Sequence, residues 1–380
     1  MNSKVHNIVT APGKKKILAI DAGGTRGVIS VEILACMEAM LREALGADDS
    51  FVLSDYFDFF AGTSASANIA CFLSLGLPVE KIRGLAKEHV RLSFAKNSWR
   101  WRWRSKFDGQ YFSTALKKEL GEDMLLGTDA LNTLLMLVMR NAQTESPWPV
   151  TNNPYAMFNK RDMPGCNLDL PLWQLVRASS AAPPLFAPQK IKIGEHEFTF
   201  EDGAISPYSN PSFIAFLQAT VEPYNIRWKT GVEDMLLVSV GNGRYSGKCD
   251  ALHPMGRTLL ENAKVLPVSL LRAANDEQDM LCRVFGRCLA GPLLDSEIGD
   301  LINSSGPVSS KLFTYVRYNF DITEAFFQEI GISDIDLDII RSVAAADHLE
   351  ELEEIGKVIG RHFIRKEHYQ DFLFKNTNNA

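Results

Sequence analysis

Apolar and polar positions alternate in blocks along the first fifth of the chain. Residues 17–20 form an apolar run that predicts a short strand, and apolar residues then recur at helical spacing over 29–45. A second apolar run, 56–61, predicts a buried strand, and the apolar helical pattern of 67–75 stops at a glycine. The order strand, turn, helix, strand, turn, helix predicts an α/β fold with a mainly parallel central sheet and flanking helices.

The pattern of apolar residues in the rest of the chain predicts more helix than strand. The expected elements are mostly helix over 78–141, a long loop over 145–171, a helix over 172–180, strands over 195–200, 235–240 and 313–318, and mostly helix from 254. We therefore expect a polar N-terminal segment (1–16), an α/β core (17–250) and a mostly helical C-terminal extension (251–380) packed on that core. The extension shows no catalytic signature, so we expect it to act as a cap, an oligomer interface or a regulatory element.

Composition and charge argue against several classes of protein but do not identify the class to which this chain belongs. Of 380 residues, 46% are hydrophobic and 23% charged, and the net charge is −6, which argues against general affinity for DNA or RNA. The six cysteines form no C-x-x-C pair, and no carboxylate or histidine cluster has metal-ligand spacing, so we expect no metal and no cofactor. We see neither a signal peptide nor an apolar stretch long enough to span a membrane, and therefore expect a cytoplasmic protein.

The turn after the second predicted strand is the most informative stretch of the chain. It reads Gly62-Thr63-Ser64-Ala65-Ser66. A serine in a tight turn between a strand and a helix is typical of a nucleophile elbow, which exposes the hydroxyl at a sheet edge. Serine among small residues also caps helices. By itself the stretch supports either a nucleophile at Ser64 or a helix cap.

A serine nucleophile needs a base and donors for the developing oxyanion. None of the seven histidines stands in a glycine-rich or strand-end turn, and His196 fits a solvated hairpin position. Asp202 is better placed, because it follows an alternating strand and precedes Gly203. A partly desolvated carboxylate there can accept a proton, although an ordinary Asp-Gly turn explains the same residues.

A glycine-rich turn, Asp21-Ala22-Gly23-Gly24-Thr25-Arg26-Gly27, follows the first predicted strand. Successive glycines at a helix N-terminus leave amide groups open to a phosphate or an oxyanion, and Arg26 adds positive charge. The turn also resembles the first phosphate loop of sugar kinases and actin-like ATPases. Those folds continue with another strand of a hairpin, whereas an amphipathic helix follows here. A plain strand-to-helix turn is the third interpretation.

The order of these parts resembles the bacterial type of the patatin-like phospholipase family. That family has a D-G-G-G-x-R-G loop, then a G-x-S-x-G elbow, then a D-G-[GA] aspartate. The stretches that carry the resemblance are 21–27, 62–66 and 202–204, together with 177–183 and 238–243. The resemblance covers about residues 17–245.

The resemblance implies a three-layer sandwich that acts as a serine lipid acyl hydrolase on membrane phospholipids. Ser64 would be the nucleophile and Asp202 the base of a Ser–Asp dyad without histidine. The implied oxyanion hole lies at Gly23, Gly24, Thr25 and Arg26, where the two glycines donate hydrogen bonds and the arginine supports the loop or the charge of the site. Some bacterial members of the family are effectors of antiphage signalling that a cyclic nucleotide activates, and this chain is compatible with such an antiphage role and a cyclic-nucleotide activator, although no motif shows them. A homo-oligomer is a separate expectation, for which the C-terminal extension or the run 99–104 would supply the interface.

The chain departs from the family pattern at two positions. Ala22 replaces the first glycine of the triple, which matters only if that position needs a positive φ. Ser66 replaces the glycine that lets the elbow helix pack close to its strand. The main alternative to an enzyme is a ligand-gated phosphate- or nucleotide-binding protein, or a pseudoenzyme, on the same fold.

A run of alternating tryptophan and arginine stands out from the acidic chain. Its members are Trp99, Arg100, Trp101, Arg102, Trp103 and Arg104. In an extended segment the tryptophans and the arginines would lie on opposite faces. Tryptophan favours the bilayer interface and arginine binds phosphates, so the run predicts peripheral contact with the inner face of the membrane or with a phosphate-bearing activator. A subunit interface and a half-buried segment are the other interpretations.

Overall fold

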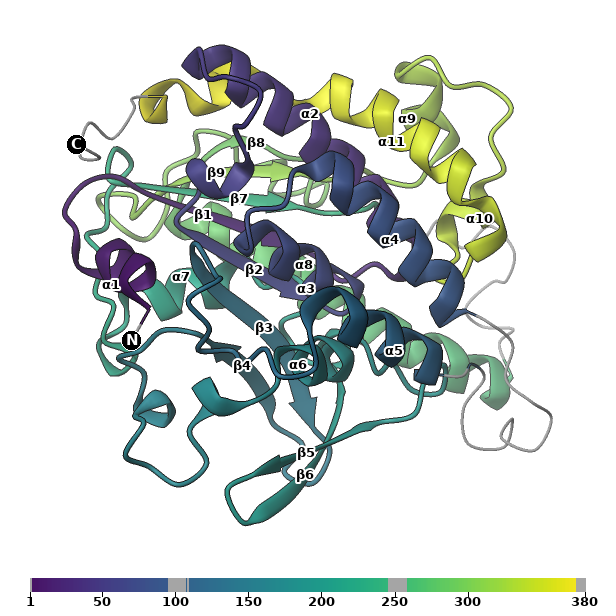
Figure 1. Cartoon of the computed structure of the whole chain (residues 1–380). Helices are drawn as coiled ribbons and strands as arrows, with labels where there is room; N and C mark the ends of the chain where they lie inside the picture. Colours follow the sequence, from purple (N-terminus) through teal and green to yellow (C-terminus); the bar gives the residue numbers. More distant parts are fainter. Residues whose placement is uncertain (1, 95–106, 108, 245–257, 374–380) are drawn as a thin grey trace.

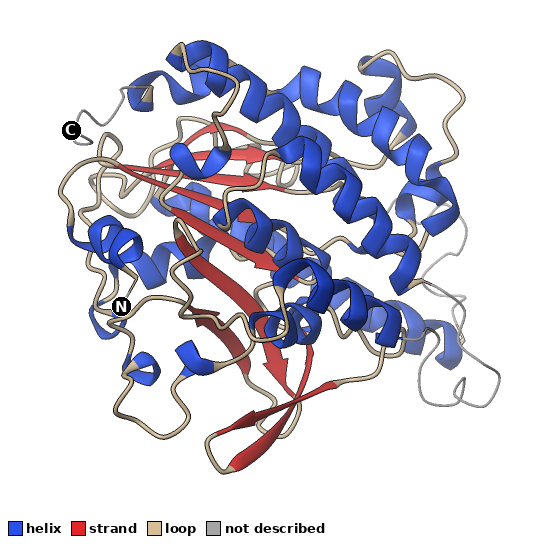
Figure 2. Ribbon diagram, viewed as in Figure 1, coloured by secondary structure: helices blue, strands red, loops and turns tan. Residues whose placement is uncertain are grey.

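One mixed sheet runs through the centre of the protein (Figures 1 and 2). The structure is a computed structural model that describes residues 2–94, 107, 109–244 and 258–373. The strands of the described part are β1 (Lys15–Ile20), β2 (Phe59–Thr63), β3 (Leu134–Asn141), β4 (Pro147–Thr151), β5 (Gln189–Ile193), β6 (His196–Asp202), β7 (Met235–Val240), β8 (Arg287–Ala290) and β9 (Thr314–Tyr318). They lie in the order β5-β6-β3-β2-β1-β7-β9-β8, and β4 pairs with β3.

The middle of the sheet is parallel. β1 pairs in parallel with β2 on one side and β7 on the other, and β2–β3, β7–β9 and β8–β9 are also parallel. β4, β5 and β6 are joined by antiparallel pairings at the β3 side of the sheet. Parallel strands direct their carboxyl ends to the same edge of the sheet, which is where ligands bind in open α/β folds.

Helices cover both faces of the sheet. The helices of the described part are α1 (Ser3–Thr10), α2 (Gly27–Leu45), α3 (Ala65–Ser74), α4 (Val79–Ser93), α5 (Gly109–Leu120), α6 (Leu172–Ser179), α7 (Ser212–Thr220), α8 (Leu259–Phe285), α9 (Glu324–Glu329), α10 (Leu337–Arg341) and α11 (Leu349–Phe363). In Figure 1, α2 to α6 and α9 to α11 lie in front of the sheet, whereas α7 and α8 lie behind it. Helices on both faces of a mainly parallel sheet make the three-layer sandwich expected from the sequence.

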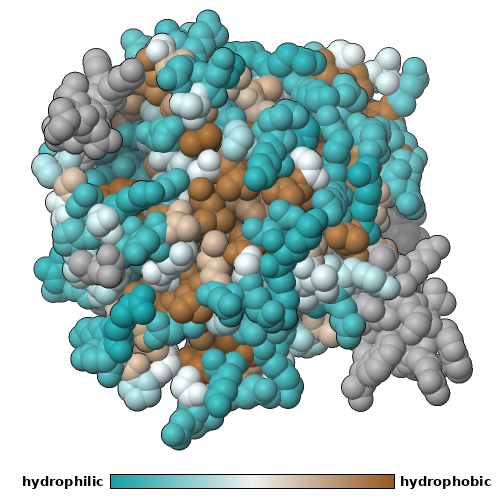
Figure 3. Space-filling view, viewed as in Figure 1, coloured by the Kyte–Doolittle hydropathy of each residue, from teal (hydrophilic) through white to brown (hydrophobic). Residues whose placement is uncertain are grey.

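The two faces of the sheet have separate hydrophobic cores. Every residue of β1 is buried, and its side chains alternate between the cores: Leu18 and Ile20 pack on the α2 side, Ile17 and Ala19 on the α7 side. A strand buried on both faces is apolar throughout, which is why the run 17–20 was a strong strand signal. Figure 3 shows that polar side chains cover much of the outer surface on the α2 side, with hydrophobic ones gathered across its middle.

The sequence-based expectations were correct for β1, β2, β7 and the helices that follow β1 and β2, and wrong for several other elements. Residues 134–141 are the central strand β3, not helix, because a fully buried apolar run has no periodicity that distinguishes a strand from a helix. The expected loop over 145–171 contains β4. β5 and β8 were not predicted at all; both are short, and β5 alternates polar and apolar residues over only five positions.

The region after residue 250 contributes both helices and strands. β9 extends the parallel sheet beside β7, and β8 follows at its edge. α11 packs closely on α2, since a Cβ at Gly356 would lie 2.8 Å from Glu32 Cβ and one at Gly360 would lie 2.7 Å from Cys36 Sγ. In the residues that the structure describes, no helix is long and apolar enough to cross a membrane.

Candidate active site

The loops that follow three parallel strands meet at one edge of the sheet. Ile20, at the end of β1, is in register with Gly62 of β2 and with Val240 of β7. Asp202 is the last residue of β6, which runs antiparallel to β3, and it pairs with Met139 of β3. Stretches more than a hundred residues apart in the sequence are thereby brought to one place.

Ser64 occupies the strained turn expected of a nucleophile elbow. Its φ of 62° and ψ of −134° lie in a region that residues with a side chain rarely adopt, at the junction between β2 and α3. The turn is tight enough that a Cβ at Gly62 would lie 2.3 Å from the Ser66 carbonyl oxygen, so only glycine fits there. The Ser64 N–H donates to Ser179 Oγ at 2.9 Å, and this contact holds the turn from the side of α6.

The Ser64 hydroxyl donates a hydrogen bond to the Asp202 carboxylate. Ser64 Oγ lies 2.6 Å from Asp202 Oδ2, and the other carboxylate oxygen accepts the Ala204 N–H at 2.8 Å. Asp202 is 1% exposed, and this burial raises its pKa to about 7, against the hydrogen bonds from Ser64 and Ala204 and the positive charge of Arg177. A carboxylate whose pKa lies near neutral pH can accept the serine proton.

The glycine-rich turn after β1 offers two amides that have no acceptor. Gly23 has a negative φ (−157°), whereas Gly24 has a φ of +56°, which favours glycine. Among the residues that the structure describes, the N–H groups of Gly23 and Gly24 donate to no acceptor, and both residues line the same cavity as Ser64. Ala65, directly after Ser64, lines the same cavity, and its N–H is also unpaired within the described ranges.

The other two residues of the implied oxyanion hole, Thr25 and Arg26, have backbone amides that already donate to carbonyl groups. The Thr25 N–H donates to the Val343 carbonyl at 3.1 Å, and the Arg26 N–H donates to the Gly23 carbonyl at 3.1 Å. Both amides are therefore occupied and cannot bind an oxyanion. The Arg26 guanidinium donates to the Gly243 carbonyl at 3.0 Å, and support of the loop is one of the two roles that the resemblance implies for Arg26.

The two departures from the family pattern have simple structural consequences. Ala22 does not have a positive φ, so its methyl group introduces no backbone strain. Ser66 does more than replace a glycine, since its hydroxyl donates to the Asp21 carbonyl at 2.7 Å and ties the first turn of α3 to the glycine-rich turn. The close packing of helix on strand is secured by Gly62 instead.

A mostly apolar cavity of about 420 Å³ begins at Ser64 and Asp202. Its wall includes residues of α2 to α5, of α8 and of the segment that follows α6. Two wall residues, Val268 of α8 and Val343, are 65% and 42% exposed, so the cavity opens to the surface beside them. Sequence reasoning missed both residues, because neither belongs to a recognisable motif.

His89 of α4 also lines the cavity, but it does not take the place of a catalytic histidine. It is buried, its Nδ1 lies 2.7 Å from Asn68 Nδ2, and burial lowers its pKa to about 4. The acceptor of the Ser64 hydroxyl is the Asp202 carboxylate.

In the part of the chain that the structure covers, no group of three or more His, Cys, Asp or Glu residues could hold a metal ion. The run Trp99–Arg104 lies outside the described residues.

Comparison with known proteins identifies the family to which this arrangement belongs. The family model for patatin-like phospholipase matches residues 18–216, which include the glycine-rich turn, the elbow and Asp202. The chain belongs to the patatin-like phospholipase family. Among curated patatin relatives, Patatin-17 of Solanum cardiophyllum is 28% identical over 247 residues, and Patatin-T5 of Solanum tuberosum is 26% identical over 246 residues. Each alignment covers 60% of this chain and 61% of the relative's own length.

Relatives in the patatin-like family are not all named as active enzymes. "Probable inactive patatin-like protein 9" of Arabidopsis thaliana is 26% identical over 244 residues, again covering 60% of this chain and 61% of that protein. Among solved structures, VipD from Legionella pneumophila aligns over 91% of this chain and 68% of its own, with 13% identity and a TM-score of 0.37.

Proposed function

We propose that the protein is a serine acyl hydrolase in which Ser64 is the nucleophile and Asp202 the general base. The observation that carries the proposal is the 2.6 Å hydrogen bond from Ser64 Oγ to a buried carboxylate at the head of an apolar cavity. Asp202 takes the Ser64 proton as Oγ attacks an ester carbonyl carbon. The carbonyl oxygen becomes an oxyanion, for which the N–H groups of Gly23, Gly24 and Ala65 are the available donors.

The second half of the reaction reverses the direction of proton transfer. Protonated Asp202 gives its proton to the leaving alcohol, the C–O bond of the ester breaks, and the acyl group stays on Ser64. Water then attacks the acyl-enzyme and loses its proton to Asp202; as the tetrahedral intermediate breaks down, that proton passes to Ser64 Oγ and the fatty acid leaves. No histidine is needed, because the pKa of Asp202, raised to about 7, lies close to neutral pH.

The substrate class we propose is the ester-linked fatty acid of a membrane phospholipid. Family membership supports a lipid substrate, and the apolar wall of the cavity supports an acyl chain. Peripheral contact with a membrane is part of the proposal, since the exposed side chains at the cavity mouth, Val268 and Val343, are aliphatic. A cyclic-nucleotide activator, a role in antiphage defence and a homo-oligomer stay predictions from the resemblance.

Fatty-acid release from phospholipid vesicles tests the dyad. Wild type is compared with Ser64→Ala and Asp202→Asn, each of which we expect to lose at least about a thousandfold in kcat. The matched controls are Ser113→Ala and Asp169→Asn: the Ser113 hydroxyl bonds only within its own helix, and Asp169 pairs with Arg161 at the surface. Equal release from wild type and both dyad variants would exclude the dyad.

A fluorophosphonate probe tests the nucleophile independently of substrate choice. Labelling should occur on Ser64 and be lost in Ser64→Ala, whereas labelling of another residue would exclude the elbow assignment. Assays with and without candidate cyclic nucleotides separate constitutive from activated enzyme. No release and no labelling under any of these conditions would favour the ligand-binding or pseudoenzyme alternative.

A further inference from the structure

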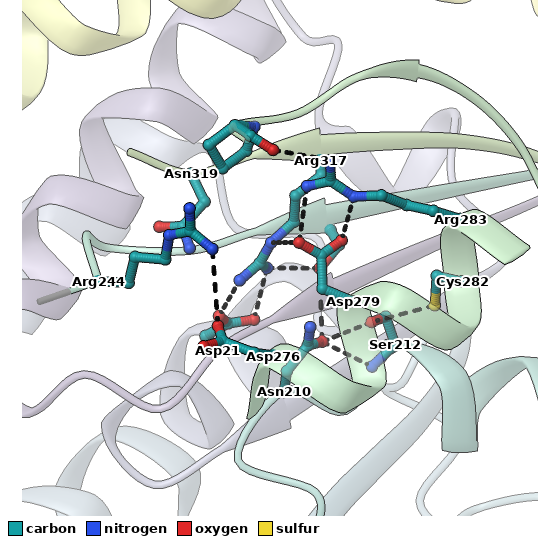
Figure 4. Close-up of polar contacts among 12 residues, drawn as sticks. Asp21, Asn210, Ser212, Arg244, Asp276, Asp279, Cys282, Arg283, Arg317 and Asn319 are labelled. Atoms are coloured by element: carbon teal, nitrogen blue, oxygen red, sulfur yellow. Dashed lines mark hydrogen bonds and ion pairs between the residues drawn. The ribbon is translucent and has the colours of Figure 1, made fainter. Parts of the chain in front are cut away.

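A buried cluster of charged residues lies beneath the glycine-rich turn (Figure 4). Asp21, Asp279, Arg283 and Arg317 are all at most 4% exposed, and they come from the end of β1, from α8 and from β9. Two carboxylates and two guanidinium groups balance in charge, which is the condition under which such groups can be buried. The cluster connects a catalytic loop of the family region with elements outside residues 18–216.

Arg317 is the residue of this cluster that contacts the catalytic loop. Its two terminal nitrogens bind the Asp21 carboxylate in parallel, Nη1 to Oδ1 at 2.8 Å and Nη2 to Oδ2 at 2.5 Å. Nη1 also donates to Ser239 Oγ of β7 at 2.7 Å, and Nε lies 3.8 Å from Asp279 Oδ2. A paired contact of two N–H groups with two oxygens fixes direction as well as distance. Arg317 therefore determines where the Asp21 side chain lies.

Asp21 in turn determines the position of both parts of the active site. Its backbone N–H donates to Val240, and its carbonyl accepts the Ser66 hydroxyl at 2.7 Å, so it is bonded to the sheet and to the first turn of the elbow helix. Gly23 and Gly24, whose N–H groups have no acceptor among the described residues, begin two positions after Asp21. A shift of Asp21 would move these amides relative to Ser64.

The same C-terminal part of the chain holds the loop at a second point. Thr25 donates its N–H to the Val343 carbonyl, and its hydroxyl oxygen accepts the Ala345 N–H at 3.2 Å. The loop is thus fixed at its first residue by β9 and near its end by the segment after α10. Both contacts come from outside the region that the family model matches.

We propose that Arg317 is a positioning residue for the oxyanion loop and that β9 is therefore part of the catalytic apparatus. The inference rests on the proposed acyl-hydrolase function. Arg317 does not touch the substrate. Its bidentate contact with Asp21 keeps the Gly23 and Gly24 amides directed at the oxyanion, so its loss should reduce kcat more than it changes KM.

The test compares Arg317→Lys with Arg283→Lys. Arg283 is a matched control: it is completely buried in the same cluster, but it binds Asp279 at 2.9 and 2.7 Å and does not contact Asp21. Lysine keeps the charge at either position and loses the paired geometry. We expect Arg317→Lys to lower kcat and the rate of fluorophosphonate labelling of Ser64 by at least about tenfold, with KM within about threefold, and Arg283→Lys to keep the wild-type kcat.

A second variant keeps the test decisive if Arg317→Lys does not fold. Asp21→Asn retains one acceptor for Arg317 and should show the same kcat defect, and the double variant should be no slower than the slower single one. Wild-type kcat in either single variant, or an equal loss in Arg283→Lys, would overturn the inference. Failure of the proposed function is distinguishable, because wild type itself would then neither hydrolyse ester nor react with the probe.

Discussion

At the scale of single residues, the candidate site depends on side chains held in environments that cost stability. Ser64 has a strained backbone, and Asp202 is a carboxylate almost completely removed from water. Each arrangement persists because its surroundings fix it: the turn by Ser179 and Gly62, the carboxylate by Ser64 and Ala204. The same burial that destabilises the charged carboxylate gives it a pKa suited to a base.

The pH dependence of hydrolysis should follow the ionisation of Asp202. Only the ionised carboxylate can accept the Ser64 proton, and its pKa is raised to about 7 by burial. We expect kcat/KM to rise with pH through about 7 and then level off, as measured with a small ester whose own ionisation does not change. A profile that is flat from pH 5 to 9 would contradict the assignment of Asp202 as base.

Stability should show the opposite dependence on pH. Because the folded-state pKa of Asp202 is higher than its unfolded value, the folded protein binds more protons between about pH 4 and 7, and the contribution of Asp202 to stability falls as pH rises through this range. Asparagine carries no charge at any pH, so Asp202→Asn removes this loss of stability at high pH. We expect this inactive variant to be more stable than wild type at pH 8 by at least about 1 kcal/mol, with a difference that shrinks toward pH 4 in urea unfolding.

The residues that could be predicted from sequence are those with motif spacing. Ser64, Asp202, Gly23 and Gly24 line one cavity, and each belongs to a turn that glycine and serine mark in the sequence; their catalytic roles stay predictions. The occupied amide of Thr25 could not be predicted, because its acceptor, Val343, is more than three hundred residues away. A hydrogen bond between such distant backbone groups leaves no local pattern.

At the scale of elements, β3, β5 and β8 were not recognised as strands from the sequence. The first six residues of β3 are all apolar, so a helix and a strand would show the same pattern there, and β5 and β8 are too short to show a period. α8 presents a further feature that the sequence did not show. Its first half has apolar side chains on the cavity side, at Val268 and Leu271, and also on exposed positions, at Leu266 and Leu270.

The exposed side of α8 should contribute to membrane contact. Leu266 and Leu270 are 58% and 69% exposed next to Val268 at the cavity mouth, where a lipid would enter. We expect Leu266→Glu with Leu270→Glu to weaken co-sedimentation with phospholipid vesicles at least about fivefold and to leave hydrolysis of a short water-soluble ester unchanged.

A matched control for α8 exists elsewhere on the surface. Met157 and Phe158 are each 60% exposed but do not line the cavity. Met157→Glu with Phe158→Glu adds the same charge and should keep wild-type vesicle binding. Equal weakening by the two pairs would show that general charge, not the side of α8, controls the contact.

At the scale of the whole molecule, the sheet does not end where the family match ends. The match stops at residue 216, yet β7, β9 and β8 continue the same sheet, and α11 covers α2. The division at residue 250, with a C-terminal extension packed on a core, stays a prediction. Sequence patterns gave the helices of this region but not the fact that its strands enter the central sheet, because pairing partners are not encoded locally.

Truncation after residue 250 tests that division. The shortened chain would lack β8, β9 and α11, leaving the edge of β7 unpaired and the apolar side of α2 uncovered. We expect it to show no cooperative thermal transition by circular dichroism, in contrast to the full chain. A truncated protein with a sharp transition would support an independently stable core.

The glycine-rich turn is contacted by β9 and by the segment after α10. The ribosome makes both of these after the turn itself, which affects when the turn can take its final structure. A ribosome completes Ser64 and Asp202 long before it reaches Arg317 and Val343, which contact Asp21 and Thr25. If the turn needs these contacts, a growing chain carries its nucleophile and base without a formed oxyanion hole. The proposed lipolytic activity would then appear only after Arg317 and Val343 have been made, so that shorter nascent chains would leave the membranes of the producing cell intact.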